Sequence, residues 1–406
     1  MRKILFVMFA ALSLAACEKD FQSQTEKTEL ETVVQNNKVS LKQALLYAEN
    51  SINGINPTTR STERKVKSTE IYVAKPATRS AEDTEVSFYL INYEDNEGFA
   101  MVSTDSRATP VYAYSDSGNL TPEDFETNPF LKIFRDGSVE QYQIEVASYD
   151  DRLPIELPDS IYGDITRLPI VEYDGGYYYE EKSSETISKD ELLTTEWHQH
   201  DVYGSACDNF IAGCGPLAAA QIMAYHKHPE QHNGHIYNWD AMTATPTLNN
   251  QSSGWTYVAA LIEDIGGEAG ANYYDDRTGT TSIGIKNAFI DFDYNCGHPA
   301  SYNIDRIREN IDAEHPIFIS GDNSEGNGHS WVIDGYHHTT YRTTYYYTYE
   351  PYARYDTFVS STRTYFHCNL GSCYYLQDYE PNGYYYAYSL SYPNDIEVIY
   401  DIEPNL

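Results

Sequence analysis

The pattern of apolar and polar positions divides the chain into a short apolar start, a polar stretch and two longer segments that can each build a core. The apolar run at 4–14 follows Arg2 and Lys3 and ends in small residues, which is the pattern of a secretory signal. It is too short for a stable membrane-spanning helix, which needs about 20 apolar residues. We therefore expect residues 1–16 to be a signal peptide.

The first longer segment, 41–150, predicts a small α+β domain that ends near Tyr149. A Ser N-cap precedes apolar positions at helical spacing over 40–48. The Thr-, Ser- and Arg-rich stretch at 51–83 is expected to be mobile. Apolar runs separated by a polar turn then predict a β-hairpin and one further strand, at 86–93, 99–103 and 111–114.

The second longer segment, 191–406, places its predicted helices before its predicted strands. Helices are expected directly after Cys214, at 256–265 and at 304–313, and strands at 317–320 and 330–335. That order favours an α+β domain. Between the two segments, 151–190 carries scattered prolines and a glycine pair, so we interpret it as a linker of the kind that proteases cut.

Length and charge narrow the possible function classes. At 406 residues the chain has room for two domains and tails. Its 27 Lys and Arg against 61 Asp and Glu give a net charge of −34, so its field repels nucleic acid. Nucleic acid is therefore not an expected partner, and the 39 tyrosines fit strand-rich packing.

The cysteines indicate the compartment. Leu14-Ala15-Ala16-Cys17 resembles a bacterial lipobox, whose cysteine is acylated and becomes the new N-terminus. We expect a lipidated tether at 17–40 and a protein anchored to the bacterial cell envelope, or extracellular after processing; an ordinary signal with a chance cysteine is the alternative. Export permits disulfides. Four cysteines allow three connectivities: Cys207, Cys296, Cys368 and Cys373.

Cys214 and His329 are the candidate pair for nucleophilic chemistry. Cys214 follows a glycine at the start of an Ala-rich helical run, where free N–H groups and the helix dipole stabilise a thiolate. His329 follows a Gly-rich loop on an apolar strand and can act as its base, because the two need to meet only in the fold. Cys207 is the rival thiol, but no predicted helix or base accompanies it, which favours a structural role.

Three further sets of polar residues are candidates for a catalytic or metal-binding role beside this pair. Gln199 has the carboxamide that an oxyanion hole uses beside the N–H of Cys214. Asp334 falls on the opposite strand face from His329, so a structural role is favoured. The four histidines at 226, 228, 232 and 235 fit no standard metal-site spacing and the chain has no C-x-x-C pair, so no metal or cofactor is expected.

Five ordered motifs resemble those of the streptopain family of secreted bacterial cysteine peptidases. They are Trp197-x-Gln199, Gly213-Cys214, the run 220–229, Gly328-His329-x-Trp331 and the run 365–369. The stretch 92–115 is similar to the inhibitory propeptide of those zymogens. The resemblance implies a papain-like peptidase domain at 191–406, preceded by an inhibitory propeptide domain at 41–150.

Carried over by position, the resemblance implies Cys214 as nucleophile, His329 as base, Gln199 in the oxyanion hole and Asn369 as the group that orients the imidazole. The family has Trp-Gly-Trp after that asparagine, whereas this chain has Leu370-Gly371-Ser372, so the indole expected to shield the histidine is absent. An insertion at 337–364 is interpreted as a hairpin close to the site, either a substrate contact or a surface elaboration.

These observations predict an exported, lipid-anchored cysteine endopeptidase made as a zymogen. Its substrates are expected to be proteins or peptides, its own propeptide is the expected intramolecular inhibitor, and activating cleavage is expected between Lys182 and Lys189. Two alternatives remain open. One is a Cys-His amidase acting on cell-wall peptides, and the other is a degenerate surface lipoprotein that binds peptides.

Overall fold

The structure, a computed structural model, describes residues 37–55, 64–74, 85–149, 171–173, 176–323, 326, 328–349, 352–371, 382–391 and 395–406. The predicted signal peptide, Cys17 and most of the predicted tether lie outside the described residues, as do Ser372 and Cys373. In the described part of the chain, no helix combines the length and apolar character needed to cross a bilayer.

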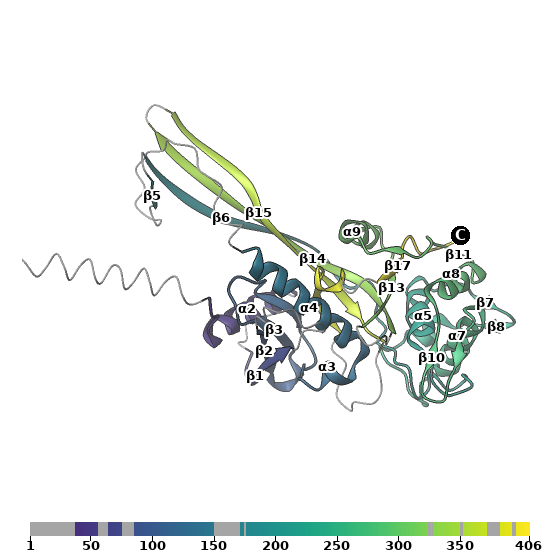
Figure 1. The fold of residues 1–406 in the computed structure, drawn as a ribbon. Coiled ribbons are helices and arrows are strands. Elements are labelled where there is room, and N and C mark those ends of the chain that lie inside the picture. The colour runs from purple at the N-terminus through teal and green to yellow at the C-terminus, as the bar shows by residue number, and fades with distance from the viewer. Residues whose placement is uncertain are drawn as a thin grey trace, which may run out of the picture.

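The N-terminal unit is an antiparallel four-stranded sheet with helices packed against it (Figure 1). The predicted hairpin is confirmed, with Asn92 opposite Phe99, and the predicted helix runs on to Ile55. The elements are α2 (Leu41–Ile55), β1 (Val66–Ala74), β2 (Val86–Tyr93), η1 (Glu94–Asn96), β3 (Phe99–Ser103), β4 (Val111–Ser115), α3 (Asp124–Thr127) and α4 (Pro129–Ala147).

Strand β1 lies within the stretch that was expected to be mobile, so that prediction is wrong for Val66–Ala74. Only Tyr72 and Ala74 of this strand are buried, which leaves little alternation for sequence analysis to detect. Its order comes from backbone pairing along β2, from Val66 opposite Tyr93 to Ala74 opposite Val86.

The C-terminal unit combines five helices with the remaining strands, so the α+β class is confirmed. The helices are α5 (Cys214–His226), α6 (Trp239–Met242), α7 (Trp255–Glu268), α8 (Ser282–Asp291) and α9 (Ile304–Asp312), with the short η3 (Ser389–Ser391). The strands of its main sheet are β12 (Ala300–Ser301), β13 (Ile317–Asp322), β14 (Gly328–Tyr349), β15 (Tyr352–Asn369), β16 (Gly383–Tyr386) and β17 (Glu397–Ile399). Three two-stranded pairs complete it: β7 (Gln231–His232) with β8 (His235–Ile236), β9 (Asn272–Tyr273) with β10 (Thr278–Gly279), and β11 (Tyr294–Asn295) with β18 (Glu403–Pro404).

One sheet runs through both units. Its order is β1-β2-β3-β4-β16-β15-β14-β13-β17-β12, and β4 pairs with β16 through Tyr114 opposite Tyr384 and Ala113 opposite Tyr385. A single hydrophobic core also contains buried residues of both units, among them Phe130 and Trp331. A second core lies between α5, α7 and α8 on the far side of the C-terminal unit.

Residues 176–189 form strand β6 (Gly176–Lys189), which pairs with β14 from Lys189 opposite Tyr336 to Tyr178 opposite Tyr347; the short β5 (Val171–Tyr173) pairs with β6. The structure therefore differs from the linker expected over this part of 151–190. The composition of this segment suggested a linker because its partner, β14, lies more than 130 residues further along the chain in its first paired residues, from Tyr336 on. Local patterns around 176–189 carry no information about that pairing. Residues 151–170 lie outside the described residues.

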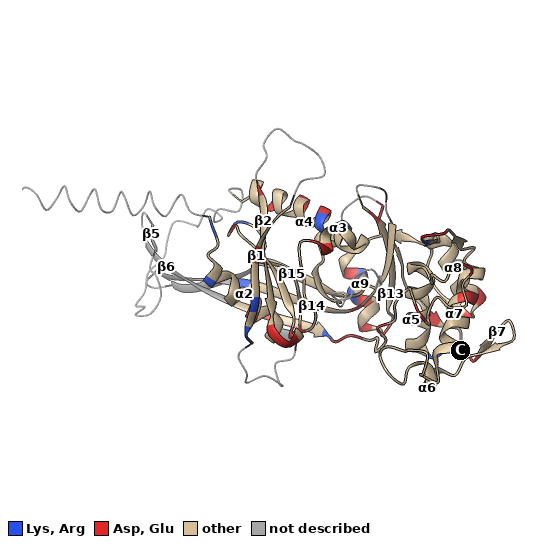
Figure 2. Ribbon diagram, turned by 90° about the horizontal axis from the view of Figure 1, so that it is seen from below, with Lys and Arg blue, Asp and Glu red and all other residues tan. Residues whose placement is uncertain are grey.

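The insertion at 337–364 is a hairpin, as expected, but it is not close to the site. β14 and β15 pair as far as Tyr349 opposite Tyr352, and with β6 they form a long arm. Figure 1 shows this arm leaving the body on the side away from α5. Figure 2 shows Asp and Glu on both units.

Candidate active site

Cys214 is the first residue of α5, as the sequence predicted. The N-cap residue Gly213 has φ 83°, a left-handed value that favours glycine, and a Cβ there would lie 2.9 Å from the Thr278 side chain. Small buried side chains at Ala218, Ala219 and Ala220 let α5 pack closely in its core. The thiol therefore sits where the free N–H groups and positive dipole end of a buried helix favour an anion.

His329 lies at the start of β14, opposite Gly321 of β13. Its Nε2 is 2.9 Å from the backbone oxygen of Leu370, and its ring stacks on Trp331 with 6.2 Å between centroids. A carbonyl oxygen can only accept, so Nε2 carries the proton. Nδ1 is then the nitrogen that can accept a proton from a thiol.

The electrostatics single out one thiol. Burial would raise the pKa of Cys214, but hydrogen bonding to His329 and the charge of His329, together with hydrogen bonds from Ser330, outweigh burial and lower the pKa. Burial raises the pKa of Cys207 and of Cys296 to about 11 and that of Cys368 well above its ordinary value. Among the described cysteines, all of them free thiols, only Cys214 is shifted toward the reactive thiolate.

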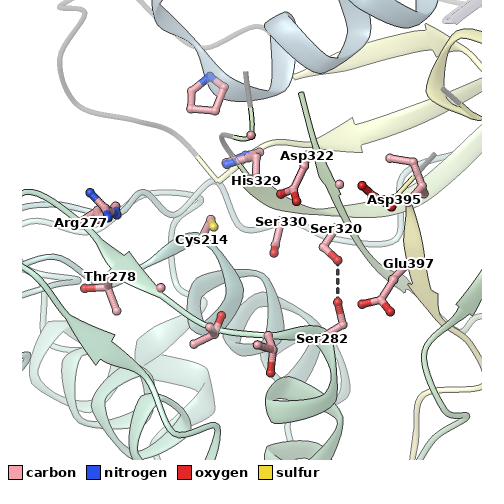
Figure 3. Close-up of a pocket in the computed structure, with 18 of the residues that line it drawn as sticks. Cys214, Arg277, Thr278, Ser282, Ser320, Asp322, His329, Ser330, Asp395 and Glu397 are labelled. Atoms are coloured by element: carbon pink, nitrogen blue, oxygen red, sulfur yellow. Dashed lines mark hydrogen bonds between the residues drawn. The ribbon is translucent and has the colours of Figure 1, made fainter. Parts of the chain in front are cut away.

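The cavity at this point has a volume of about 1180 Å³ and is lined by Cys214, His329 and Gln199. Figure 3 shows Cys214 and His329 facing the same hollow, with Ser330 beside them. A backbone hydrogen bond from Ala212 N to Gln199 O, 2.9 Å long, ties the glutamine segment to the residues just before Cys214. The structure thus brings together three of the four predicted site residues.

Asn369 lies behind this cavity and is buried, and its side chain is engaged elsewhere. Its Nδ2 donates to the Thr195 oxygen at 2.7 Å, and its Oδ1 accepts from Gln221 Nε2 at 3.0 Å. The group placed against the imidazole is the carbonyl of the next residue, Leu370. A backbone oxygen leaves no pattern in the sequence, so the motif indicated Asn369 and not the next residue, Leu370, whose carbonyl meets the imidazole.

Gln221 was missed by sequence analysis. It is fully buried on α5, two turns after Cys214, and its Oε1 accepts from Trp197 N at 3.1 Å while its Nε2 reaches Asn369. This amide chain joins the segment before Gln199, the helix of Cys214 and the end of β15. A single Gln in an otherwise apolar helix was the signal that could have revealed it, because a buried amide needs partners.

The other weighed residues serve the scaffold. Asp334 is buried, accepts from His367 Nδ1 at 2.6 Å and from Leu193 N at 3.0 Å, and so fixes the start of the C-terminal unit. His232 contacts Glu268 at 3.0 Å and His235 contacts Asp264 at 2.7 Å.

Comparison with known proteins places these residues in a family context. Residues 197–379 match the model of the Peptidase C10 family. Residues 36–141 match the model of the Spi protease inhibitor. We call these the C10 segment and the Spi segment.

Two similar proteins were found, one by sequence and one by structure. The thiol protease/hemagglutinin PrtT of Porphyromonas gingivalis is 25% identical over 297 residues, which is 64% of this chain and 32% of the relative. This chain thus spans about a third of that relative's length. A fragment of Prevotella intermedia prointerpain A is 17% identical with a TM-score of 0.48, covering 82% of this chain and 98% of the fragment.

The C10 segment contains all four predicted site residues, and the Spi segment borders the same cavity. Thr127, Pro129 and Lys132, around the start of α4, line the cavity from the N-terminal side. A segment that matches a protease-inhibitor model therefore borders the cavity that contains Cys214 and His329.

Proposed function

We propose that this chain is a cysteine endopeptidase that cuts peptide bonds through Cys214 and His329. The observation that carries the proposal is the lowered pKa of the Cys214 thiol beside His329, at a helix start that opens into a large cavity. The match of the C10 segment and the thiol protease named among the similar proteins support the same activity.

The proposed mechanism follows from the geometry. His329 takes the proton of the Cys214 thiol, and the thiolate sulfur attacks the peptide carbonyl carbon. The resulting oxyanion is stabilised by the Cys214 N–H and the Gln199 carboxamide, each worth roughly 10²–10³ in rate. His329 protonates the departing amine, which leaves a thioester on Cys214. His329 then takes a proton from water, which hydrolyses the thioester and restores the thiol.

We assign the orientation of the imidazole to the Leu370 carbonyl and give Asn369 a positioning role. The contact from His329 Nε2 to Leu370 O leaves Nδ1 for the thiol. The hydrogen bonds of the Asn369 amide hold the end of β15 that presents this carbonyl.

The zymogen proposal rests on the Spi segment, whose residues line the cavity. The expected cut between Lys182 and Lys189 falls within β6, which is paired with β14. Peptidases bind extended, unpaired chain, so a cut there requires β6 to leave the sheet. A cut N-terminal to β6 leaves the sheet intact, and this is the position that we favour.

The test compares residues 18–406 with the Cys214→Ala variant on casein and on purified peptidoglycan, with intact-mass analysis of each chain. We expect casein digestion and a shortened chain only when Cys214 is present. Release of peptides from peptidoglycan without casein digestion would favour the amidase. Binding of peptides without cleavage of either substrate would favour the degenerate surface protein.

Export and lipid anchoring through Cys17 are a separate proposal, supported by the apolar run at 4–14 and by Leu14-Ala15-Ala16-Cys17. Labelled palmitate supplied to a bacterial host should enter the full chain and not a Cys17→Ala variant. Equal labelling of the two chains would contradict the anchor and leave the peptidase proposal standing.

A further inference from the structure

The N-terminal unit is joined to the C-terminal unit by more than the chain between them. We call the contact of β4 with β16, together with the side chains packed around it, the seam. Besides the two-residue backbone pairing, Tyr365 OH donates to Val111 O at 2.8 Å and Ser115 Oγ donates to Asn382 O at 2.8 Å. The seam is therefore a continuation of the sheet.

Aromatic packing extends the seam into the core. Phe130 of α4 lies edge-on to Trp331 at 5.1 Å and to Tyr385 at 4.8 Å, and Phe134 meets Tyr385 at 4.9 Å. All four side chains are fully buried. Loss of the N-terminal unit would bare this apolar surface and the edge of β16 at once, which disfavours dissociation.

One titratable side chain lies within the seam. His337 of β14 is only 6% exposed, its Nδ1 lies 2.8 Å from Tyr114 OH of β4, and its ring stacks on Tyr384 of β16 at 4.1 Å. The Tyr114 hydroxyl can donate to Nδ1 of the neutral ring or accept from an Nδ1–H, so this contact fits either protonation state. What favours the neutral imidazole is the burial of the ring under β4 and β16 when the N-terminal unit is docked.

The charged groups around His337 do not offset its burial. Glu191 and Asp190, just after β6, favour the cation, whereas His367 of β15 opposes it, and burial is the largest effect and lowers the pKa of His337 to about 4. Burial would lower the pKa of His367, but its ion pair with Asp334 outweighs burial and raises that pKa. Tyr114 and Tyr384 complete the surroundings and keep their protons, because burial raises the pKa of each phenol.

We propose that the seam keeps the N-terminal unit bound to the peptidase unit after the chain between them has been cut, and that protonation of His337 weakens this binding. The partner of the β16 edge is thus the cleaved N-terminal unit of the same chain. The inference rests on the proposed zymogen, and it adds that cleavage alone does not free the active site at neutral pH.

The sign and size of the pH effect follow from linkage. The His337 pKa is below its ordinary 6.5 when docked, so protonation favours the undocked form and binding weakens as the pH falls from about 7 toward 4. With values of 6.5 free and about 4 docked, the dissociation constant should rise about 30-fold between pH 8 and pH 5.

The experiment uses residues 18–406 with Cys214→Ala, so that no self-digestion occurs, and a foreign protease site inserted between 150 and 171. After complete cutting, the dissociation constant of the two pieces is measured at pH 8 and pH 5. We expect the pieces to co-elute at pH 8 and to separate with an about 30-fold higher constant at pH 5. Pieces that separate at pH 8 would overturn the proposed retention.

Two histidine variants isolate the switch. His337→Gln can still accept from Tyr114 but does not titrate, so its binding should be as tight at pH 5 as at pH 8. The control is His338→Gln, since His338 is the next residue of β14 and bonds Thr364 of β15 instead, at 2.8 Å; it should keep the wild-type pH dependence. An unchanged pH dependence in His337→Gln would overturn the role of His337.

If His337→Gln does not fold, Tyr114→Phe provides the second variant. It removes the hydroxyl that meets Nδ1 but leaves His337 buried and titratable, so it should weaken binding at both pH values and keep the rise of the dissociation constant from pH 8 to pH 5. A constant that does not rise between pH 8 and pH 5 in this variant would contradict the switch. Because all pieces carry Cys214→Ala, these outcomes are independent of catalysis, and an inactive wild-type chain with an intact seam would count only against the proposed function.

Discussion

A chain of buried amides behind the site connects Trp197, Gln221 and Asn369. None of these groups faces the cavity described for Cys214 and His329, yet each holds a segment that carries one of the site residues. The Leu370 carbonyl, which follows Asn369, is the group that meets the imidazole. At the scale of single residues, the geometry of the proposed site thus depends on side chains that do not line its cavity.

Gln221→Ala should impair both stability and activity. It leaves the buried Trp197 N–H without this acceptor, at a cost of about 1–3 kcal/mol, and it removes one of the donors to Asn369 Oδ1, which keeps the Gly371 N–H at 3.4 Å. Urea unfolding in a Cys214→Ala background measures the stability, and kcat against KM on a peptide substrate measures the geometry. We expect kcat to fall more than KM changes.

The control for this variant is Gln251→Ala, in an exposed loop. It should change the free energy of unfolding by no more than about 0.5 kcal/mol. A Gln221→Ala protein with the stability and kcat of this control would show that the amide chain does not support the site.

At the scale of elements, helix α4 matters because its first turn both borders the cavity and anchors the seam. Pro129 and Lys132 line the cavity, and Phe130 between them packs on Trp331, whose ring stacks on His329. The Asn128 side chain caps this turn by accepting from Leu131 N at 3.1 Å. The N-terminal unit therefore contacts His329 through Trp331.

Phe130→Ala should destabilise the whole chain, because a fully buried ring shared by both units is lost. Truncations of this kind cost about 3–5 kcal/mol. The matched control, Phe210→Ala, removes a ring that is 69% exposed and should be close to neutral. Equal midpoints of urea unfolding for the two variants would contradict a shared core.

The arm of β6, β14 and β15 is the element that we expect to be dispensable for catalysis. Replacing 343–358 with Asn-Gly would join Arg342 to Val359, which are paired across the hairpin, by a two-residue turn. Because the arm extends away from the cavity (Figure 1), casein hydrolysis should stay within about twofold of wild type. A tenfold loss would show that the arm contributes to substrate binding.

At the scale of the whole molecule, the sequence predicted what local patterns encode. Gly213 before Cys214 and the Ala-rich run after it predicted the start of α5, and the hairpin at Val86–Ser103 followed from two apolar runs separated by a polar turn. Sequence analysis did not predict strands β1 and β6, because these strands are ordered by pairing with partner strands elsewhere in the chain. It did not predict the seam, because no local pattern marks β4 as the neighbour of β16. Sheet pairing between remote segments is the information that one sequence lacks.

The central claim is that Cys214 is a thiolate nucleophile activated by His329. The most direct measurement is alkylation of residues 18–406 by iodoacetamide at pH 6, with peptide mass mapping of wild type, Cys214→Ala and His329→Ala. Its lowered pKa predicts that Cys214 is the one rapidly modified thiol among the described cysteines, and that this modification is lost with Cys214→Ala and strongly slowed with His329→Ala. Cys207 and Cys296, with pKa values of about 11, should stay unmodified. Modification spread over several cysteines, or an unchanged rate in His329→Ala, would contradict the claim.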